Sequence, residues 1–298
     1  MSGFDLPAYL TARRALVDAA LERVLPPEDA PPPTVHRAMR YSVMAGGKRL
    51  RPILVIAGAE AVGGAAAEVM PTACALELIH TYSLIHDDLP AMDDDDYRRG
   101  RLTSHKVFGE AIAILAGDAL LTLAFRLVAD NAASVKDPRA VGDAVAEIAD
   151  AAGTAGMVGG QVVDIESEGK AVSAGTLEYI HLHKTAALIR ASLRVGARLA
   201  GGDAAAVAAI SEAGRDLGLA FQIVDDILDV EGSLEQLGKT AGKDQRQRKA
   251  TYPALHGLEA SRREARRLVE RVKTRLAGLG ERGAPLGALA DYVFERKN

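Results

Sequence analysis

Apolar residues recur every three or four positions along most of the chain, and no stretch keeps the strict alternation of a half-buried strand. Polar breaks divide this pattern into segments of helical length. The pattern predicts helices over residues 5–24, 34–45, 53–63, 67–88, 109–131, 139–162, 176–200, 203–230, 258–279 and 284–296. The proline-rich run at 26–33 ends the first helix, and residues 166–175 are predicted to form a loop. The predicted fold class is therefore all-α.

Composition supports this prediction and narrows the function. Ala, Leu and Val dominate, and there is no Trp; Ala and Leu are strong helix formers. The length of 298 residues fits one large domain or two small ones. The formal net charge is −4, with no basic tail and no interleaving of basic and aromatic residues. These features argue against a nucleic-acid partner.

Cysteine use and hydropathy indicate a cytoplasmic protein with no membrane span. The single cysteine, Cys74, lies in an apolar run, which excludes a disulfide framework and disfavours a reactive thiol. The most apolar stretch, 111–129, carries Asp118 and Arg126. The N-terminal segment is charged and lacks the apolar core of a signal peptide.

An acidic stretch dominates residues 80–105. Six of the ten residues 87–96 are aspartates, and they are Asp87, Asp88, Asp93, Asp94, Asp95 and Asp96. Arg98 and Arg99 follow directly. Such like charge repels itself unless a cation is present, and Mg²⁺ binds a few carboxylates together with phosphate oxygens. We interpret the stretch as an anion site made of metal and arginine; the alternative is an acidic surface loop.

Helix geometry decides which of these aspartates can act together. In an unbroken helix the six-residue gap would put Asp87 and Asp93 far apart in angle. Pro90 interrupts the helix, so we expect Asp93 to return to the side of Asp87.

A second acidic cluster closes the predicted helix 203–230. Asp225 and Asp229 are four residues apart and share a face with Gln222, while Asp226 stands beside them. The surrounding residues are apolar, and carboxylates in an apolar helix need a compensating charge. A cation would supply it.

Basic residues lie in three further places. The segment GGKRLRP at 46–52 offers Lys48 and Arg51 after a glycine pair that permits a tight turn. A solvated corner is the alternative for that segment, and a snorkelling surface lysine is the alternative for Lys184. Residues 238–253 carry Lys239 and Lys249 and fail the spacing of a phosphate-binding P-loop, so we interpret them as a basic flap.

Together the two acidic clusters suggest two helices that face each other across one cavity. Carboxylates from both would hold Mg²⁺ ions, and the ions would hold a diphosphate. The basic residues exceed what one diphosphate needs, so two anionic substrates fit better. Departure of diphosphate assisted by metal needs no serine or cysteine nucleophile, and apolar walls would keep water from a carbon cation.

These motifs resemble those of the trans-prenyl diphosphate synthases of the farnesyl diphosphate synthase type. The pattern D-D-x4-D-x4-R-R-G spans residues 87–100, and D-D-x-x-D spans 225–229. The GGKRLRP segment, the Lys184-Thr185 pair and the KATYPAL segment match as well. The resemblance covers nearly the whole chain, which implies one polyprenyl synthase domain over residues 1–298.

The resemblance implies an isoprenoid synthase bundle around a deep cavity, usually as a homodimer. The implied reaction is head-to-tail condensation of isopentenyl diphosphate with an allylic diphosphate, with about three Mg²⁺ ions per site. By resemblance, Asp87, Asp93 and Asp225 are Mg²⁺ ligands. The other metal-site residues, which support them, are Asp88, Asp226 and Asp229.

The family also implies roles for the remaining polar residues. Arg98, Lys184 and Lys239 resemble the residues that hold the allylic diphosphate. The residues that resemble the family's isopentenyl diphosphate site are Lys48, Arg51, His80 and Arg99. Lys249 is a further predicted substrate contact. Thr185 and Gln222 would stabilise the allylic cation. The implied catalytic set is Asp87, Asp88, Asp93, Lys184, Thr185, Gln222 and Asp225.

Product length is predicted from the residue five positions before the first aspartate, which in this family acts as a floor for the growing chain. Here that residue is Tyr82. Its bulk favours a farnesyl (C15) product, and the geranylgeranyl (C20) product is the alternative. A terpene cyclase or head-to-head synthase is disfavoured by the second-substrate residues. A non-catalytic modifier subunit is disfavoured by the intact aspartate motifs.

Overall fold

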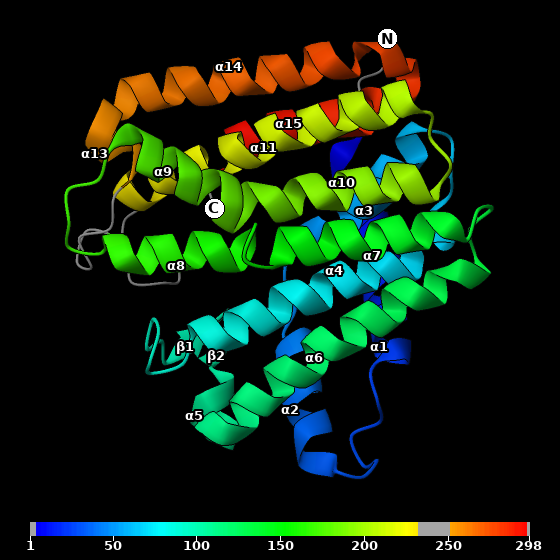
Figure 1. Cartoon of the computed structure of the whole chain (residues 1–298), viewed down its shortest axis with the longest axis vertical. Coiled ribbons are helices and arrows are strands. Elements are labelled where there is room, and N and C mark those ends of the chain that lie inside the picture. The colour runs from blue at the N-terminus through cyan, green and yellow to red at the C-terminus, as the bar shows by residue number, and fades with distance from the viewer. Residues whose placement is uncertain (1–3, 232–250, 297–298) are drawn as a thin grey trace.

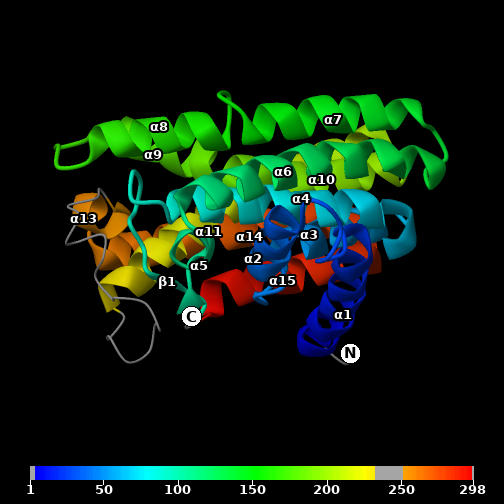
Figure 2. The same ribbon diagram turned by 90° about the horizontal axis from the view of Figure 1, so that it is seen from below.

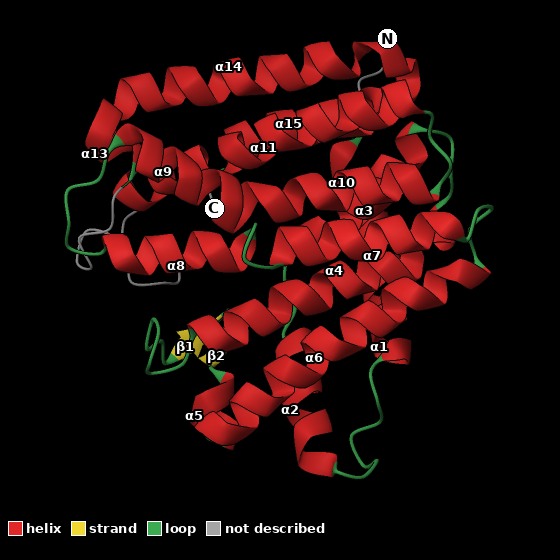
Figure 3. Cartoon of the chain, in the orientation of Figure 1, coloured by secondary structure: helices red, strands yellow, loops and turns green. Residues whose placement is uncertain are grey.

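Long α-helices lie side by side and form most of the structure (Figure 1). The computed structural model describes residues 4–231 and 251–296. The helices are α1 (Leu6–Val24), α2 (Pro33–Val43), α3 (Leu50–Ala61), α4 (Ala66–Asp87), α5 (Ser104–Phe108), α6 (Glu110–Asp130), α7 (Arg139–Ala152), α8 (Met157–Ser167), α9 (Ala174–Ile180), α10 (Ala187–Leu199), α11 (Ala204–Glu231), α13 (Tyr252–His256), α14 (Leu258–Leu276) and α15 (Ala284–Glu295). The all-α prediction is confirmed, and Figure 3 shows a two-stranded hairpin as the small exception.

Helix starts follow local capping chemistry. The Asp5 side chain accepts a hydrogen bond from the backbone N–H of Ala8, and Ser173 and Thr251 cap α9 and α13 in the same way. Proline lies in the first turn of α1, α2, α13 and α15, where its missing N–H has no helical partner to lose. These local signals explain why several observed starts lie close to the predicted ones.

The predicted helix over 139–162 is wrong, because the chain breaks between α7 and α8. The backbone N–H groups of Gly156 and Gly159 both donate to the Gly153 carbonyl, so the chain turns back on itself there. A Cβ at Gly156 would lie 2.1 Å from the Ala151 carbonyl oxygen, so only glycine fits this turn. The predicted loop at 166–175 is shorter as well, because α8 continues to Ser167 and α9 begins at Ala174.

The predicted helix over 176–200 contains a π-helical turn, η2 (His181–Ala186), between α9 and α10. The wider turn packs closely against two glycines. A Cβ at Gly160 of α8 would lie 2.2 Å from the backbone nitrogen of Lys184. A Cβ at Gly218 of α11 would lie 2.5 Å from the Ala186 Cα. Wide helical turns of this kind often occur at functional sites.

A short hairpin and the helix α5 follow the acidic stretch and were not predicted. Strand β1 (Tyr97–Arg98) pairs antiparallel with β2 (Arg101–Leu102), with Arg98 opposite Arg101. The two turn residues, Arg99 and Gly100, have φ values of 54° and 75°. Two central residues with positive φ are typical of a tight hairpin turn.

Two apolar clusters form the core, and the pair α3 and α10 contributes to both. The backbones of these two helices approach closely, because a Cβ at Gly58 would lie 2.2 Å from the Leu193 carbonyl oxygen and one at Gly196 would lie 2.0 Å from that of Val55. In Figure 2, α7 and α8 lie along one side of the bundle, and α1 and α15 lie on the opposite side. The helices α4 and α11, which carry the acidic clusters, lie between these sides.

One helical stretch among the described residues, 110–133, is long and apolar enough to cross a membrane by length and composition. Of its most apolar window, 39% is buried inside the protein. Core helices of water-soluble proteins meet the same criteria, so the stretch is weak evidence for a span.

Candidate active site

The first acidic cluster begins where α4 ends. After Pro90 the chain folds back, and the backbone N–H of Asp93 donates to the Asp87 carbonyl at 2.8 Å. The N–H of Asp95 donates to the Asp88 carbonyl at 3.2 Å in the same manner. The expected return of Asp93 to the side of Asp87 is therefore confirmed.

The carboxyl group of Asp87 is in an unfavourable place for a negative charge. Burial raises its pKa from the ordinary 3.8 to about 6. The Lys184 ammonium opposes this rise, and the neighbouring Asp93 carboxylate adds to it. The two aspartates and Lys184, which are far apart in sequence, thus influence one another across the site.

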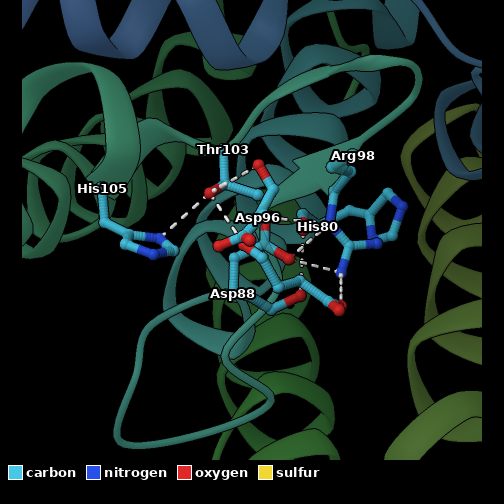
Figure 4. Close-up of polar contacts among 8 residues, drawn as sticks. His80, Asp88, Asp96, Arg98, Thr103 and His105 are labelled. Atoms are coloured by element: carbon cyan, nitrogen blue, oxygen red, sulfur yellow. Dashed lines mark hydrogen bonds and ion pairs between the residues drawn. The ribbon is translucent and has the colours of Figure 1, made fainter. Parts of the chain in front are cut away.

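The neighbouring Asp88 has a different role, because its carboxylate is bound by Arg98. The Arg98 Nε donates to both carboxylate oxygens at 2.7 and 2.9 Å, and its Nη2 lies 2.6 Å from Oδ1 (Figure 4). Asp88 is 3% exposed. This bidentate pair holds the Arg98 guanidinium in a fixed orientation beside the cluster.

Two residues that the sequence did not single out fix the loop behind this pair. Thr103 Oγ1 donates to the Asp95 carbonyl at 2.8 Å, and the Thr103 N–H donates to the Asp96 carbonyl at 3.0 Å. The ring of His105 lies 3.1 Å from the same hydroxyl (Figure 4). A local signal was present, because a Thr directly before a short helix favours contacts between its hydroxyl and the neighbouring backbone.

The second acidic cluster lies in the last turns of α11. The Asp225 side chain is 56% exposed, and Arg296 Nη2 lies 3.2 Å from its Oδ1. The Arg296 guanidinium also stacks 3.8 Å from the centre of the Phe221 ring. The sequence did not predict this contact, because 71 residues separate the two partners.

A chain of hydrogen bonds connects this cluster to the π-turn. Thr185 Oγ1 donates to Gln222 Oε1 at 2.7 Å, and Gln222 Nε2 donates to Asp226 Oδ1 at 3.0 Å. Asp226 is 3% exposed. The two residues predicted from the family to face the allylic cation are therefore directly hydrogen-bonded to each other.

Lys184 points its ammonium group at an aspartate that the sequence interpretation overlooked. Its Nζ lies 2.6 Å from Asp164 Oδ2 on α8, and the lysine side chain is 29% exposed. A snorkelling surface lysine would instead reach outward into water. The local sequence gave no signal for Asp164, because its partner Lys184 is 20 residues away.

A separate group of cations surrounds His80. Burial lowers the pKa of His80 well below its ordinary value, and the nearby guanidinium groups of Arg51 and Arg99 lower it further. Burial also lowers the pKa of Arg51 to about 10. Among the residues that the structure describes, the buried Nε of Arg51 has no hydrogen-bond partner. A bound anion would favour the charged forms of His80 and Arg51 and would accept a hydrogen bond from the Arg51 Nε.

The glycine pair before Lys48 shapes this cationic group. The Arg99 guanidinium donates to the Gly46 carbonyl, and a Cβ at Gly47 would lie 2.7 Å from the Arg99 Cζ. Lys48 itself is exposed. The remaining predicted contacts, Lys239 and Lys249, lie outside the described residues.

Tyr82 lies in the core and is 8% exposed. Its ring meets the His86 ring edge-on, with the ring centres 5.7 Å apart. The His86 ring in turn covers Gly117 of α6, where an added Cβ would lie 2.2 Å from the His86 Nε2. Tyr82 is thus supported from behind by an α4–α6 contact.

Similarity to known proteins shows the family of the chain. The family model described as Polyprenyl synthetase matches residues 32–279. The chain belongs to this family. The structure has the all-α fold of its isoprenoid synthases, and the family members it matches are prenyltransferases that make isoprenyl diphosphates.

Similar proteins cover nearly the whole chain. A dimethylallyltranstransferase from Fischerella ambigua is 51% identical over 294 residues, covering 98% of this chain and 84% of that protein. A chloroplastic geranylgeranyl pyrophosphate synthase from Capsicum annuum is 50% identical over 297 residues, covering 99% and 80%. A solved structure of a putative farnesyl-diphosphate synthase from Marinomonas sp. MED121 is 40% identical with a TM-score of 0.85, covering 98% and 100%.

The donor groups of the site suit Mg²⁺ held jointly with a diphosphate. Within residues 4–231 and 251–296, no three His, Cys, Asp or Glu side chains converge as a complete cage. Mg²⁺ does not need such a cage, because it takes one or two carboxylates, water and phosphate oxygens. Burial and the Asp93 carboxylate raise the pKa of Asp87, and a bound cation would lower it again by stabilising the charged form.

The sequence interpretation of Cys74 agrees with its surroundings. The side chain is fully buried, and burial raises the pKa of the thiol to about 12. Because the thiolate is the nucleophilic form, Cys74 is inert at neutral pH.

Proposed function

We propose that this prenyltransferase condenses isopentenyl diphosphate with dimethylallyl and geranyl diphosphate, head to tail, to give farnesyl diphosphate. The observation that carries the proposal is the presence of two cationic groups near the acidic cluster at Asp87. Arg98 and Lys184 act on Asp87, Arg51 and Arg99 act on His80, and Arg98 lies close enough to act on both. Two groups fit two anionic substrates.

The first group would bind the allylic diphosphate. In this assignment Asp87, Asp93 and Asp225 hold Mg²⁺, which when bound would offset the charge that develops on the departing diphosphate. Arg98 is preorganised for the same anion by its bidentate bond to Asp88. Lys184 would turn from Asp164 towards the diphosphate or share its charge with both.

The second group would bind isopentenyl diphosphate. The lowered pKa keeps His80 neutral at physiological pH, so its ring can donate one hydrogen bond without adding charge. Arg51 has an unpartnered buried Nε, among the described residues, to offer to a phosphate oxygen. Lys48 is exposed at the edge of the same group.

The chemistry between the two groups needs no protein nucleophile. The allylic C–O bond breaks, the double bond of isopentenyl diphosphate forms the new C–C bond, and a proton then leaves for the released diphosphate. The oxygens of Thr185 and Gln222 would stabilise the positive charge on carbon. Their mutual hydrogen bond fixes them before substrate arrives.

The C15 product follows from Tyr82 as the floor. Its burial and its contact with His86 make it a stiff obstacle rather than a mobile side chain. A C20 product is the second candidate, and the name of the Capsicum annuum relative favours it. A modifier subunit would bind without turning over, and the complete aspartate motifs at 87–93 and 225–229 oppose that assignment.

The test is to incubate the purified protein with Mg²⁺, isopentenyl diphosphate and dimethylallyl diphosphate, and to measure product length by mass spectrometry. We expect C15 from the native protein, C20 or longer from Tyr82→Ala, and C15 from the matched Tyr82→Phe control. A native C20 product would keep the chemistry and select the second candidate. Absence of any condensation by the folded protein would overturn the proposed function.

A further inference from the structure

One carboxylate of the second acidic cluster, Asp226, is surrounded by protein groups on α11, η2 and α13. We propose that Asp226 is a positioning residue that fixes the Gln222 amide, and through it the Thr185 hydroxyl, and that it does not bind Mg²⁺. The proposal rests on the proposed function, because Thr185 and Gln222 are assigned there to the allylic cation.

The contacts of Asp226 use both of its oxygens. Oδ1 accepts from Gln222 Nε2 at 3.0 Å. Oδ2 accepts from the backbone N–H of Tyr252 at 2.7 Å, and His181 Nε2 lies 3.3 Å from it. With 3% exposure, Asp226 has little surface left for a hydrated cation. Its neighbour Asp225 accepts from Arg296 at Oδ1, but its side chain is 56% exposed, so a hydrated cation can reach it.

The contact with Gln222 fixes the orientation of the amide. A carboxylate only accepts hydrogen bonds, and only the NH₂ end of glutamine donates them. Asp226 therefore selects the rotamer in which Nε2 points towards α13 and Oε1 points towards Thr185. Without the carboxylate, the flipped amide would have a comparable free energy.

The orientation of the amide determines what Thr185 can offer. Because Gln222 presents Oε1, the Thr185 hydroxyl donates its only proton to that oxygen at 2.7 Å. The lone pairs of the threonine oxygen then remain available to a positive charge. With the amide flipped, Nε2 would donate to Thr185, and two partial positive charges would face the cation instead.

The first test separates a positioning residue from a metal ligand by direct binding. Calorimetry with Mg²⁺ and inorganic pyrophosphate should give an affinity for Asp226→Asn within about threefold of the native protein, whereas Asp225→Asn should lose more than about tenfold. Asp226→Glu, which keeps the charge and displaces it by one methylene, is the second variant if Asp226→Asn does not fold. A loss in either Asp226 variant equal to that in Asp225→Asn would overturn the proposal.

The second test asks whether Asp226 acts through Gln222. We expect Asp226→Asn to lower kcat roughly tenfold, and the same substitution to cost nothing further in a Gln222→Ala background. Independent, multiplying effects would overturn the proposal. Asp216→Asn is the matched control, because Asp216 is equally buried on α11 but bonds Arg275 and Arg271 on α14. It should lower stability without changing kcat.

The two proposals fail in different ways. If the native protein neither binds Mg²⁺ with pyrophosphate nor forms a prenyl diphosphate, the proposed function fails. If the native protein does both and the Asp226 variants lose metal binding, only the positioning role fails.

Discussion

At the scale of single residues, the surroundings of each aspartate separate roles that the sequence presents as equal. Asp87 and Asp88 are adjacent, yet burial raises the pKa of Asp87 to about 6 while Asp88 is held by Arg98. Asp225 and Asp226 are adjacent as well, yet one is exposed and the other is enclosed by hydrogen bonds. A carboxylate with free lone pairs can bind a cation, and one whose lone pairs are used positions its neighbours.

Asp87 should lower the stability of the metal-free protein at neutral pH. Its raised pKa means that the folded state binds the proton more tightly than the unfolded chain, so stability is lost as the pH rises from about 4 towards 6. A rise of this size in the pKa of Asp87 corresponds to at most about 3 kcal/mol of unfolding free energy. We expect Asp87→Asn to unfold at a higher temperature than the native protein at pH 8 without metal, and to unfold alike at pH 4.

The same variant should lose activity by roughly 10³-fold, because the leaving group would lack its compensating charge. Thermal unfolding by circular dichroism and a steady-state assay check the two halves. Asp150→Asn, an exposed aspartate on α7, is the control and should change neither. Retained activity in Asp87→Asn would contradict the assignment of Asp87 as a Mg²⁺ ligand.

At the scale of elements, close approach of helices sets the position of the catalytic side chains. The π-turn η2 carries Lys184 and Thr185, and it lies against α8 and α11 only because Gly160 and Gly218 have no side chain. The first turn of α3 is placed by Arg49, whose guanidinium binds three other elements. Its partners are Asp18 on α1, the Val43 carbonyl on α2 and Glu77 on α4.

Gly160→Ala is expected to push η2 away from α8. The added Cβ would lie 2.2 Å from the backbone nitrogen of Lys184, so the backbone of η2 has to move. Overpacking of this kind costs about 1–3 kcal/mol of stability, and the displaced Lys184 should raise KM for the allylic substrate. Gly142→Ala on α7 is the matched control, since nothing lies within 4 Å of its Cβ, and helix propensity should make it slightly stabilising. Urea unfolding and steady-state kinetics measure both; equal behaviour would refute the packing argument.

Arg49→Met should destabilise the protein strongly. The change leaves the Glu77 carboxylate, whose side chain is 1% exposed, without the cation 2.7 Å away, and such losses cost about 3–5 kcal/mol. Because Arg49 stands between Lys48 and Arg51, KM for isopentenyl diphosphate should rise as well. Arg126→Met removes an exposed ion pair with Asp130 and should leave the urea midpoint unchanged. A similar midpoint for both variants would contradict the prediction.

At the scale of the whole molecule, α6 and α8 each expose more than one large apolar side chain. Ile114 and Leu115 on α6 are 43% and 54% exposed, and Val158, Val162 and Ile165 on α8 are 41–48% exposed. Exposed apolar surface of this kind is typical of an association face. A second copy of the chain is the partner that the family resemblance predicts.

We therefore expect the protein to sediment as a homodimer at micromolar concentration. Leu115→Glu should weaken the dimer at least roughly tenfold, because a charge would be buried in the interface. Leu16→Glu on α1, 46% exposed in the monomer, is the control and should leave the mass unchanged. A native monomer in analytical ultracentrifugation would contradict the homodimer prediction.

The sequence predicted most helices and both acidic clusters because these depend on neighbours along the chain. Helical periodicity, the Pro90 break and the Asp225–Asp229 spacing all act over a few residues. The sequence failed at Gly156, where a turn interrupts a helical pattern, and at the π-turn, where the periodicity of the side chains barely changes. Asp164 and Arg296 were missed because their partners, Lys184 and Asp225, are 20 and 71 residues away.

By itself, the sequence determined the fold class, the family and the chemical types of the groups in the site, because spacing and side-chain chemistry are local properties. The tertiary structure decided which carboxylates remain open to a cation and which are used within the protein. It also decided that the Lys184 ammonium pairs with Asp164 and acts on Asp87 through its charge, and that Gln222 faces Thr185 with its oxygen. Burial and hydrogen-bond partners arise only when distant elements pack together, and they set the charge and orientation on which the chemistry depends.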